Sequence, residues 1–303
     1  MGTTYLVKIF DLQKNNLKFI GLHESIDSLL SQINNHLSTY IDSSEINLFN
    51  ITTSGEAFNA SESLYEVVER SLYHYKSSMG SFDITVGPIV EEWGFNSNYD
   101  VSMLPDIAKI HSLLDHTGSD KIFLDKGDIY KLDSMLKIDL GAIAKGWAVD
   151  EISELLETLD IHDYLIEIGG EILVSGYNGK SNLWEIGIRS PVNGQLMHKT
   201  IKLTDRAVAT SGTYENYFIY GENEYSHIIN PADGYPVKHE IISATVITSK
   251  CIDADAIATA IMVKGAESGM EWINSLDDVE ALVIVKNKDG DLITNISHGF
   301  TYH

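Results

Sequence analysis

Hydrophobic residues recur every three or four positions in several stretches of the chain, and this spacing predicts amphipathic helices. In residues 25–41 the apolar face consists of Ile26, Leu29, Leu30, Ile33, Leu37 and Ile41. The other stretches with this period are residues 61–78, 104–114, 145–159, 253–265 and 268–276. We therefore expect at least six helices, distributed over the whole chain.

Two of these helices carry recognisable start signals. In residues 61–78, Ser63 and Glu66 have the spacing of a capping box. In residues 104–114, Pro105 is the kind of residue that suits a first helical turn.

Alternating or continuous apolar runs predict strands between the helices. They cover residues 4–10, 164–176, 183–191 and 242–249, and a final hairpin spans 280–295 with Asp289 and Gly290 in its turn. Strands and helices do not alternate in a regular βαβ rhythm. We predict an α+β fold with mostly antiparallel sheets and flanking helices, formed by one compact domain over residues 1–303, with two lobes as a variant.

Composition narrows the function. The net charge of -23 argues against binding to nucleic acid or to anionic membranes, whose phosphates would be repelled. A small anionic ligand would need a local counter-charge, most simply a metal cation. The single cysteine, Cys251, excludes an internal disulfide and cysteine-based zinc sites. No run of 18 apolar residues predicts a membrane-spanning helix, and no glycine fingerprint predicts a Rossmann dinucleotide site.

The candidate ligand-binding and metal-binding residues are concentrated in five short segments rich in Gly, Asp, Ser and Thr. They are "GSFDITVGP" (80–88), "KIDLGAIAKG" (137–146), "ATSGTYENYF" (209–218), "YSHIINPADGYPV" (225–237) and "DADAIATA" (253–260). In the second, the small residues between Asp139 and Lys145 would let a ligand approach the backbone closely. The alternative is a structural strand-to-helix turn in which Asp139 and Lys145 form an ion pair.

In the last segment, Asp255 and Thr259 lie four residues apart on a predicted helix, so that both face the same side. A carboxylate and a hydroxyl are hard oxygen ligands that suit Mg²⁺ or Ca²⁺. Alternatively, Thr259 bonds back to its own helix and Asp255 is stabilised by the helix dipole.

These segments, in this order, resemble the signatures of the ApbE family of FAD:protein FMN transferases. The similarity extends to "MGTTY", "YIDSSEINLFN", "FDITVGPIVEEWGF", "DLGAIAKGWAVD", "IEIGGEI", "HIINPADGYPV" and "CIDADAIATAI", and so covers about 290 residues. The family's known fold agrees with the α+β expectation.

The resemblance implies specific roles for matching residues. The residues implied to contact FAD are Met1, Ser81, Phe82, Asp83, Asp139, Lys145, His227 and Ile229. The residues implied to bind Mg²⁺ are Ala142, through its backbone carbonyl, and Asp255 and Thr259, through their side chains. His227 is also the implied catalytic residue, moving a proton. A surface or core histidine is the alternative at that position.

The implied reaction transfers FMN from FAD to a Thr or Ser hydroxyl of another protein, with release of AMP. Two other functions would use the same pocket: a Mg²⁺-dependent FAD pyrophosphatase, in which water replaces the hydroxyl, and a non-catalytic FAD-binding protein. The implied acceptors are subunits of the sodium-translocating NADH:quinone reductase or of related electron-transfer complexes.

Met1 matches a methionine that follows a leader in exported members of the family. If a leader precedes Met1, the resemblance places the protein at the periplasmic face of the inner membrane. Without a leader we expect it in the cytoplasm.

Overall fold

The computed structural model describes residues 2–10, 19–95, 104–190, 196–214, 216–238 and 240–301. The helices are α1 Leu22–Leu37, α2 Glu45–Asn50, α3 Glu62–Ser77, α4 Gly87–Glu92, α5 Ile107–Leu114, the 3-10 turn η2 Ser119–Lys121, α6 Ala144–Thr158, α7 Cys251–Lys264 and α8 Ala266–Ile273. The strands are β1 Tyr5–Ile9, β2 Phe58–Asn59, β3 Ile122–Asp125, β4 Asp128–Lys131, β5 Tyr164–Ile168, β6 Glu171–Ser175, β7 Trp184–Arg189, β8 Leu196–Leu203, β9 Arg206–Gly212, β10 Tyr217–Tyr220, β11 Asn223–Ser226, β12 Ile241–Thr248, β13 Glu280–Lys286 and β14 Leu292–Ile296.

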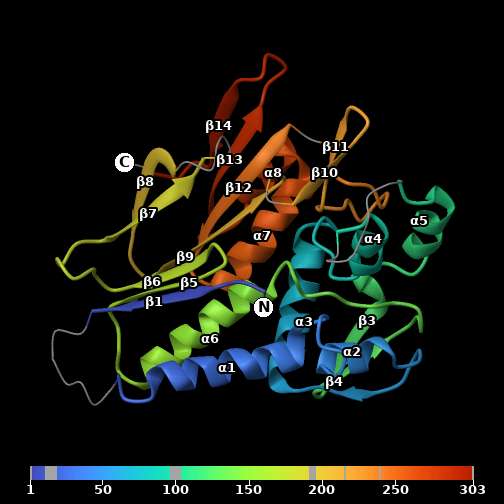
Figure 1. The fold of residues 1–303 in the computed structure, drawn as a ribbon, viewed down its shortest axis with the longest axis horizontal. Helices are drawn as coiled ribbons and strands as arrows, with labels where there is room; N and C mark the ends of the chain where they lie inside the picture. The colour runs from blue at the N-terminus through green and yellow to red at the C-terminus, as the bar shows by residue number, and fades with distance from the viewer. Residues whose placement is uncertain are drawn as a thin grey trace.

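The largest sheet is antiparallel and has the strand order β1-β5-β6-β9-β12-β13-β14. Helices α6 and α7 lie against one face of it, and the β7–β8 hairpin lies over the other (Figure 1). Successive side chains of β9 point to opposite faces of the sheet. Ala207 and Ala209 pack with the helices, and Val208 packs with Trp184 of the hairpin. The α+β fold with mostly antiparallel sheets is therefore confirmed.

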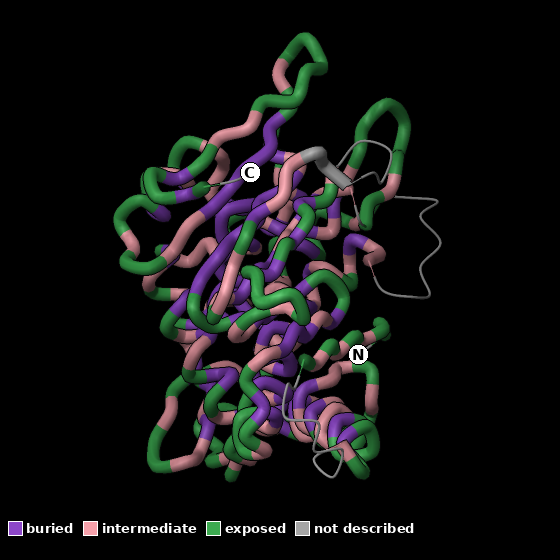
Figure 2. Tube along the Cα trace, turned by 90° about the vertical axis from the view of Figure 1, so that its left-hand side faces the viewer, coloured by how far each residue is buried: buried purple, intermediate pink, exposed green. Residues whose placement is uncertain are grey.

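Helix α7 is the central element of the helical layer. Nearly all of its side chains are buried, and Figure 2 shows the buried segments gathered in the middle of the molecule, with exposed loops and hairpin ends around them. The Lys250 side chain does not cap this helix. Instead the Asp150 carboxylate of α6 accepts from the amides of Cys251 and Ile252, at 2.8 and 2.9 Å. Within the described residues, no helix combines the length and the apolar character needed to cross a membrane.

Three local expectations were wrong. The first predicted helix ends at Leu37, because Ser38 turns to an extended conformation, and Ile41 lies beyond it. The capping serine of α3 is Ser61, whose hydroxyl accepts from the Leu64 amide, so Ser63 lies inside the helix. Helix α5 begins at Ile107 because the Asp106 carboxylate caps it, which leaves Pro105 outside.

Candidate active site

A cavity of about 330 Å³ lies between α7, the start of α6, and the loops that follow α3 and β11. Its walls include all the predicted site residues that the structure describes: Ser81, Phe82, Asp83, Asp139, Ala142, Lys145, His227, Ile229, Asp255 and Thr259. Met1 lies outside the described residues. Segments separated by up to 178 positions thus meet around one space, and their individual roles toward a ligand stay predictions.

A second cavity, of about 1050 Å³, adjoins the first. It extends along the end of α1 and the following segment, residues 38–41. Both cavities are bordered by Tyr40, Asp139, Gly141 and Lys145. The two cavities therefore share a border formed by these four residues.

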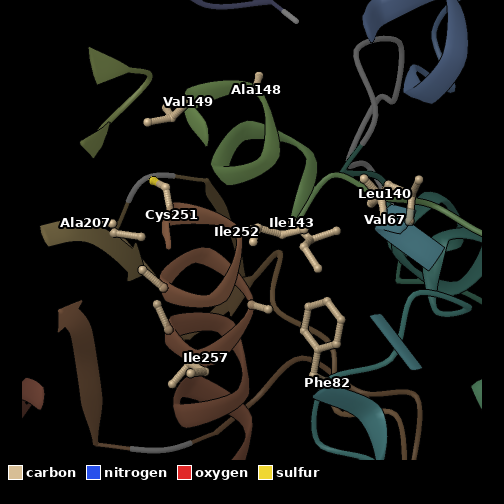
Figure 3. Packing of buried hydrophobic residues seen from close by; sticks show 14 of the residues in the cluster. Val67, Phe82, Leu140, Ile143, Ala148, Val149, Ala207, Cys251, Ile252 and Ile257 are labelled. Carbon is tan, nitrogen blue, oxygen red and sulfur yellow. The ribbon is translucent and has the colours of Figure 1, made fainter. Parts of the chain in front are cut away.

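The loop after α3 presents an aromatic wall supported from behind. Phe82 is only 2% exposed, and its ring lies beside α7 (Figure 3) with its centre 6.1 Å from the His74 ring. Asp83 accepts from the hydroxyls of Thr85 and Ser119, both at 2.6 Å. Burial raises the pKa of Asp83, although these hydrogen bonds oppose the rise. Phe82 is therefore both a core residue and part of the cavity wall, and Asp83 fixes the loop.

The loop before α6, which contains Asp139, is held directly against the loop after α3. The Asp139 amide donates to the Ile84 carbonyl at 2.7 Å, and the Asp139 carboxylate accepts from the Gly141 amide at 2.7 Å. A Cβ on Gly87 would lie 2.8 Å from the Asp139 Cβ, so glycine is required for this close approach. The two walls of the cavity are thereby fixed relative to each other.

Lys145 does not pair with Asp139, so the alternative of a simple turn closed by that ion pair is wrong. Its Nζ lies 2.8 Å from Oε1 of Glu171 on β6 and 3.6 Å from Oδ1 of Asp255 on α7. Burial alone would lower the pKa of Lys145, but the charges of Asp255 and Glu171 raise it above its usual value. Burial, reinforced by the charge of Asp255, raises the pKa of Glu171 to about 8, against the opposing effect of Lys145. Two buried carboxylates therefore share one ammonium group.

Helix α7 contributes the two side chains that the sequence placed on one face. Asp255 is 3% exposed, and its Oδ2 accepts from the Gly146 amide at 3.1 Å. Thr259, one turn further along, has its hydroxyl 3.3 Å from that of Ser211 on β9. Thr259 therefore has a hydrogen-bond partner on another element, toward the cavity.

His227 follows the β10–β11 hairpin directly. Its Nδ1 lies 3.0 Å from the Asn216 carbonyl, and its ring centre lies 6.3 Å from that of Phe95. A carbonyl oxygen only accepts hydrogen bonds, so Nδ1 carries the proton in the neutral ring and Nε2 is the basic nitrogen. The backbone thus selects the tautomer of a histidine in the cavity wall.

The donors around Asp255 fit a hard cation such as Mg²⁺. Asp255 and Thr259 offer side-chain oxygens. The Gly146 amide, whose partner in a regular α-helix would be the Ala142 carbonyl, donates to Asp255 instead. Two carboxyl groups, those of Asp255 and Glu171, lie beside the single ammonium of Lys145, and Oε2 of Glu171 is buried without a hydrogen-bond partner among the described residues. Among all residues that the structure describes, no three His, Cys, Asp or Glu side chains lie close enough together to form a metal site. Ligand and water oxygens would have to complete the coordination.

Sequence reasoning missed Glu171, Tyr40 and Ser211, which also line the cavity. Glu171 lies within the quoted "IEIGGEI" segment, but its role depends on a contact with α6 that no local pattern reveals. The sequence feature that could have identified Glu171 is its place at the start of an apolar strand, because a charge in a buried strand needs a partner.

Comparisons with known proteins identify the family of the chain. The family model described as "ApbE family" matches residues 1–283. A protein of Vibrio cholerae serotype O1 named FAD:protein FMN transferase is 36% identical, over 96% of this chain and 86% of its own length. A Haemophilus influenzae protein of the same name is 32% identical, over 99% of this chain and 88% of its own length.

Solved structures show the same similarity. The flavin transferase ApbE from Vibrio cholerae superposes with a TM-score of 0.87 at 34% identity, covering 99% of this chain and 95% of the other. The apo form of the Pseudomonas stutzeri flavinyl transferase ApbE gives a TM-score of 0.89 at 30% identity, covering 98% and 92%. The chain therefore belongs to the ApbE family. It is an enzyme, as its named relatives are.

Proposed function

We propose that the protein transfers the FMN part of FAD to a Thr or Ser hydroxyl of an acceptor protein, depends on Mg²⁺ and releases AMP. The observation that carries this proposal is the gathering of the ten predicted residues around one cavity, next to two buried carboxyl groups that share one ammonium. The names of the relatives support flavin transfer to protein. The adjoining larger cavity gives room for both halves of a dinucleotide.

In the proposed reaction, the acceptor hydroxyl oxygen forms a bond to the FMN-side phosphorus, and the bond from that phosphorus to the AMP oxygen breaks. Nε2 of His227 takes the hydroxyl proton, because Nδ1 is held by the Asn216 carbonyl. The departing AMP keeps the bond electrons on its phosphate oxygen. FMN remains on the acceptor as a phosphoester.

Asp255, Thr259 and the Ala142 carbonyl would hold the Mg²⁺, from α7 and from the loop before α6. When bound, this ion supplies Lewis-acid stabilisation of the charge that develops on the phosphoryl oxygens. The Lys145 ammonium orients polar atoms of the bound nucleotide from the same wall. The side chain of Phe82 excludes water from the flavin side of the cavity.

The test is incubation with FAD, Mg²⁺ and a candidate acceptor, such as a flavin-carrying subunit of the sodium-translocating NADH:quinone reductase. Transfer predicts a fluorescent acceptor band on a denaturing gel and one AMP per flavin bound. The same acceptor with its target Thr or Ser replaced by Ala is the control and must stay dark.

The two alternatives give different results in the same assay. A pyrophosphatase releases AMP and free FMN while the acceptor stays dark. A carrier binds FAD and releases no AMP. Either result would refute the proposed transfer.

A further inference from the structure

We infer that Glu171 is a positioning residue that holds the Lys145 ammonium away from Asp255 and so keeps Asp255 available to a divalent cation. This inference rests on the proposed function, since it assigns a role to Glu171 at the proposed Mg²⁺ site. Glu171 lines the cavity but was not among the predicted site residues. It contacts one of them, Lys145, through a hydrogen bond.

The geometry shows two carboxylates in competition for one ammonium. Nζ of Lys145 donates to Oε1 of Glu171 at 2.8 Å, whereas Oδ1 of Asp255 lies at 3.6 Å, beyond direct hydrogen-bond distance. The side chains of Glu171 and Asp255 are 3% and 4% exposed, so water contributes little to the solvation of either charge. The stronger contact is with Glu171.

The position of Glu171 is fixed by the sheet. It is the first residue of β6, pairs in register with Ile168 of β5, and follows the tight turn made by Gly169 and Gly170. Lys145 lies in the first turn of α6, whose Gly146 amide donates to Asp255. The ammonium is therefore held toward β6 while the Asp255 carboxylate is oriented by the backbone of α6.

Removal of the Glu171 carboxyl group would leave Asp255 as the nearest acidic partner of Lys145. Lys145 is half-buried and Oδ1 of Asp255 lies only 3.6 Å from Nζ, so Nζ would move onto that oxygen. A divalent cation would then have to displace the ammonium before it could bind that oxygen. The consequence is weaker metal binding without the loss of any predicted metal ligand.

The test measures Mn²⁺ binding by electron paramagnetic resonance, with FAD present, for the wild type and for Glu171→Gln. We expect the variant to bind Mn²⁺ about tenfold more weakly. Its crystal structure should show Nζ within hydrogen-bond distance of Asp255. Unchanged Mn²⁺ affinity, or an ammonium that stays at its wild-type distance, would overturn the inference.

The double variant Glu171→Gln/Lys145→Gln separates positioning from direct action on the metal. It has no ammonium to compete, so at saturating FAD it should bind Mn²⁺ more tightly than Glu171→Gln alone. Persistently weak binding would mean that Glu171 itself acts on the metal, which contradicts the inference.

Glu167→Gln is the matched charge control. Glu167 lies on the same β5–β6 hairpin, accepts from the Gly170 amide and is not part of the cavity wall. We expect its Mn²⁺ affinity to equal that of wild type. An equal loss in both variants would attribute the effect to general charge and overturn the inference.

Two further observations keep the test decisive. If Glu171→Gln does not fold, Glu171→Asp keeps the charge but shortens the side chain, and we expect a smaller loss, about threefold; no loss there would also contradict the inference. Failure of the wild type itself to bind Mn²⁺ with FAD would instead refute the metal dependence in the proposed function.

Discussion

The amide of Gly146 donates to Oδ2 of Asp255 at 3.1 Å, and this bond joins the first turn of α6 to α7. The helices approach so closely here that a Cβ on Gly146 would lie 2.3 Å from the carbonyl oxygen of Cys251. The Asp150 carboxylate, one turn further along α6, accepts from the first amides of α7. The orientation of Asp255 is therefore set by backbone contacts between the two helices.

Gly146→Ala should destabilise the protein by about 3 kcal/mol and lower turnover, because the new methyl group forces α6 and α7 apart. In an ordinary helix the same change would be stabilising. Denaturant unfolding together with AMP release measures both effects. Gly269→Ala in α8 is the control, since its nearest neighbour is the Ile261 side chain at 3.1 Å. A smaller loss in Gly146→Ala than in Gly269→Ala would contradict the backbone clash.

Asp255→Ala should reduce single-turnover AMP release by orders of magnitude, because it removes the charged oxygen donor proposed for Mg²⁺. Thr259→Ala should have a smaller effect, since a neutral hydroxyl is a weaker ligand and water can replace it. Rates measured at varied Mg²⁺ concentration compare the two variants with wild type. Near-normal turnover and Mg²⁺ dependence in Asp255→Ala would show that α7 does not hold the metal.

His227→Gln should lower the rate of transfer by about 10²- to 10⁴-fold, the usual contribution of a general base. FAD affinity should change much less, since the flavin site keeps its other contacts. Rapid-quench transfer rates and FAD titration separate the two quantities. His162→Gln, which changes an exposed histidine paired with Asp160, is the control and should behave like wild type. An undiminished rate in His227→Gln would remove this residue from the mechanism.

Lys145→Ala should weaken FAD binding while the protein stays folded, because the cavity loses its ammonium group. Lys145→Arg should restore only part of the affinity, since the planar guanidinium is larger and favours bidentate partners. Calorimetric titration with FAD measures both, and a thermal melt verifies folding. Equal FAD affinity in Lys145→Ala and wild type would restrict Lys145 to its ion pairs with Glu171 and Asp255.

Glu151→Gln should raise the melting temperature at pH 8 and have little effect at pH 5. Burial, together with the charges of Glu154, Glu66 and Glu62, raises the pKa of Glu151 to about 7, and Lys250 opposes the rise only in part. The unfolded value is about 4.3, so the folded state retains the proton between these values and loses stability as the pH rises through about 7. The neutral Gln side chain of the variant cannot ionise, so the variant does not lose this stability as the pH rises.

Scanning calorimetry at the two pH values tests this prediction. Glu24→Gln on the exposed side of α1 is a control for the loss of one carboxylate, and its effect should not depend on pH in this way. A stabilisation of Glu151→Gln that is as large at pH 5 as at pH 8 would exclude ionisation as its cause.

Long periodic elements were predictable from the sequence, because their apolar stripes are visible without knowledge of their neighbours. Helices α6 and α7, the β13–β14 hairpin and the same-face placement of Asp255 and Thr259 all follow from such local patterns. The short helices α2 and α4 were missed because six residues make too little of a helical period to detect.

The rest of the site depends on contacts between distant segments. Lys145 was expected to face a ligand or Asp139, yet its partners come from β6 and α7, which follow it by 26 and 110 positions. Similarly, the cap of α7 comes from Asp150 and not from a residue next to the helix. Local sequence specifies which chemical groups are present, and the packing of the sheet against α6 and α7 decides which of them meet.

The cavity has consequences for how the chain responds to proteolysis and to its ligand. Its walls run from Tyr40 to Val263, so no fragment that lacks either end contains a complete cavity. Binding of FAD should therefore select the fully assembled chain and, at about a hundred times the dissociation constant, stabilise it by about 2.7 kcal/mol. Under these conditions the nucleotide protects peptide bonds far from itself, and resistance to a protease reports its occupancy before any chemistry occurs.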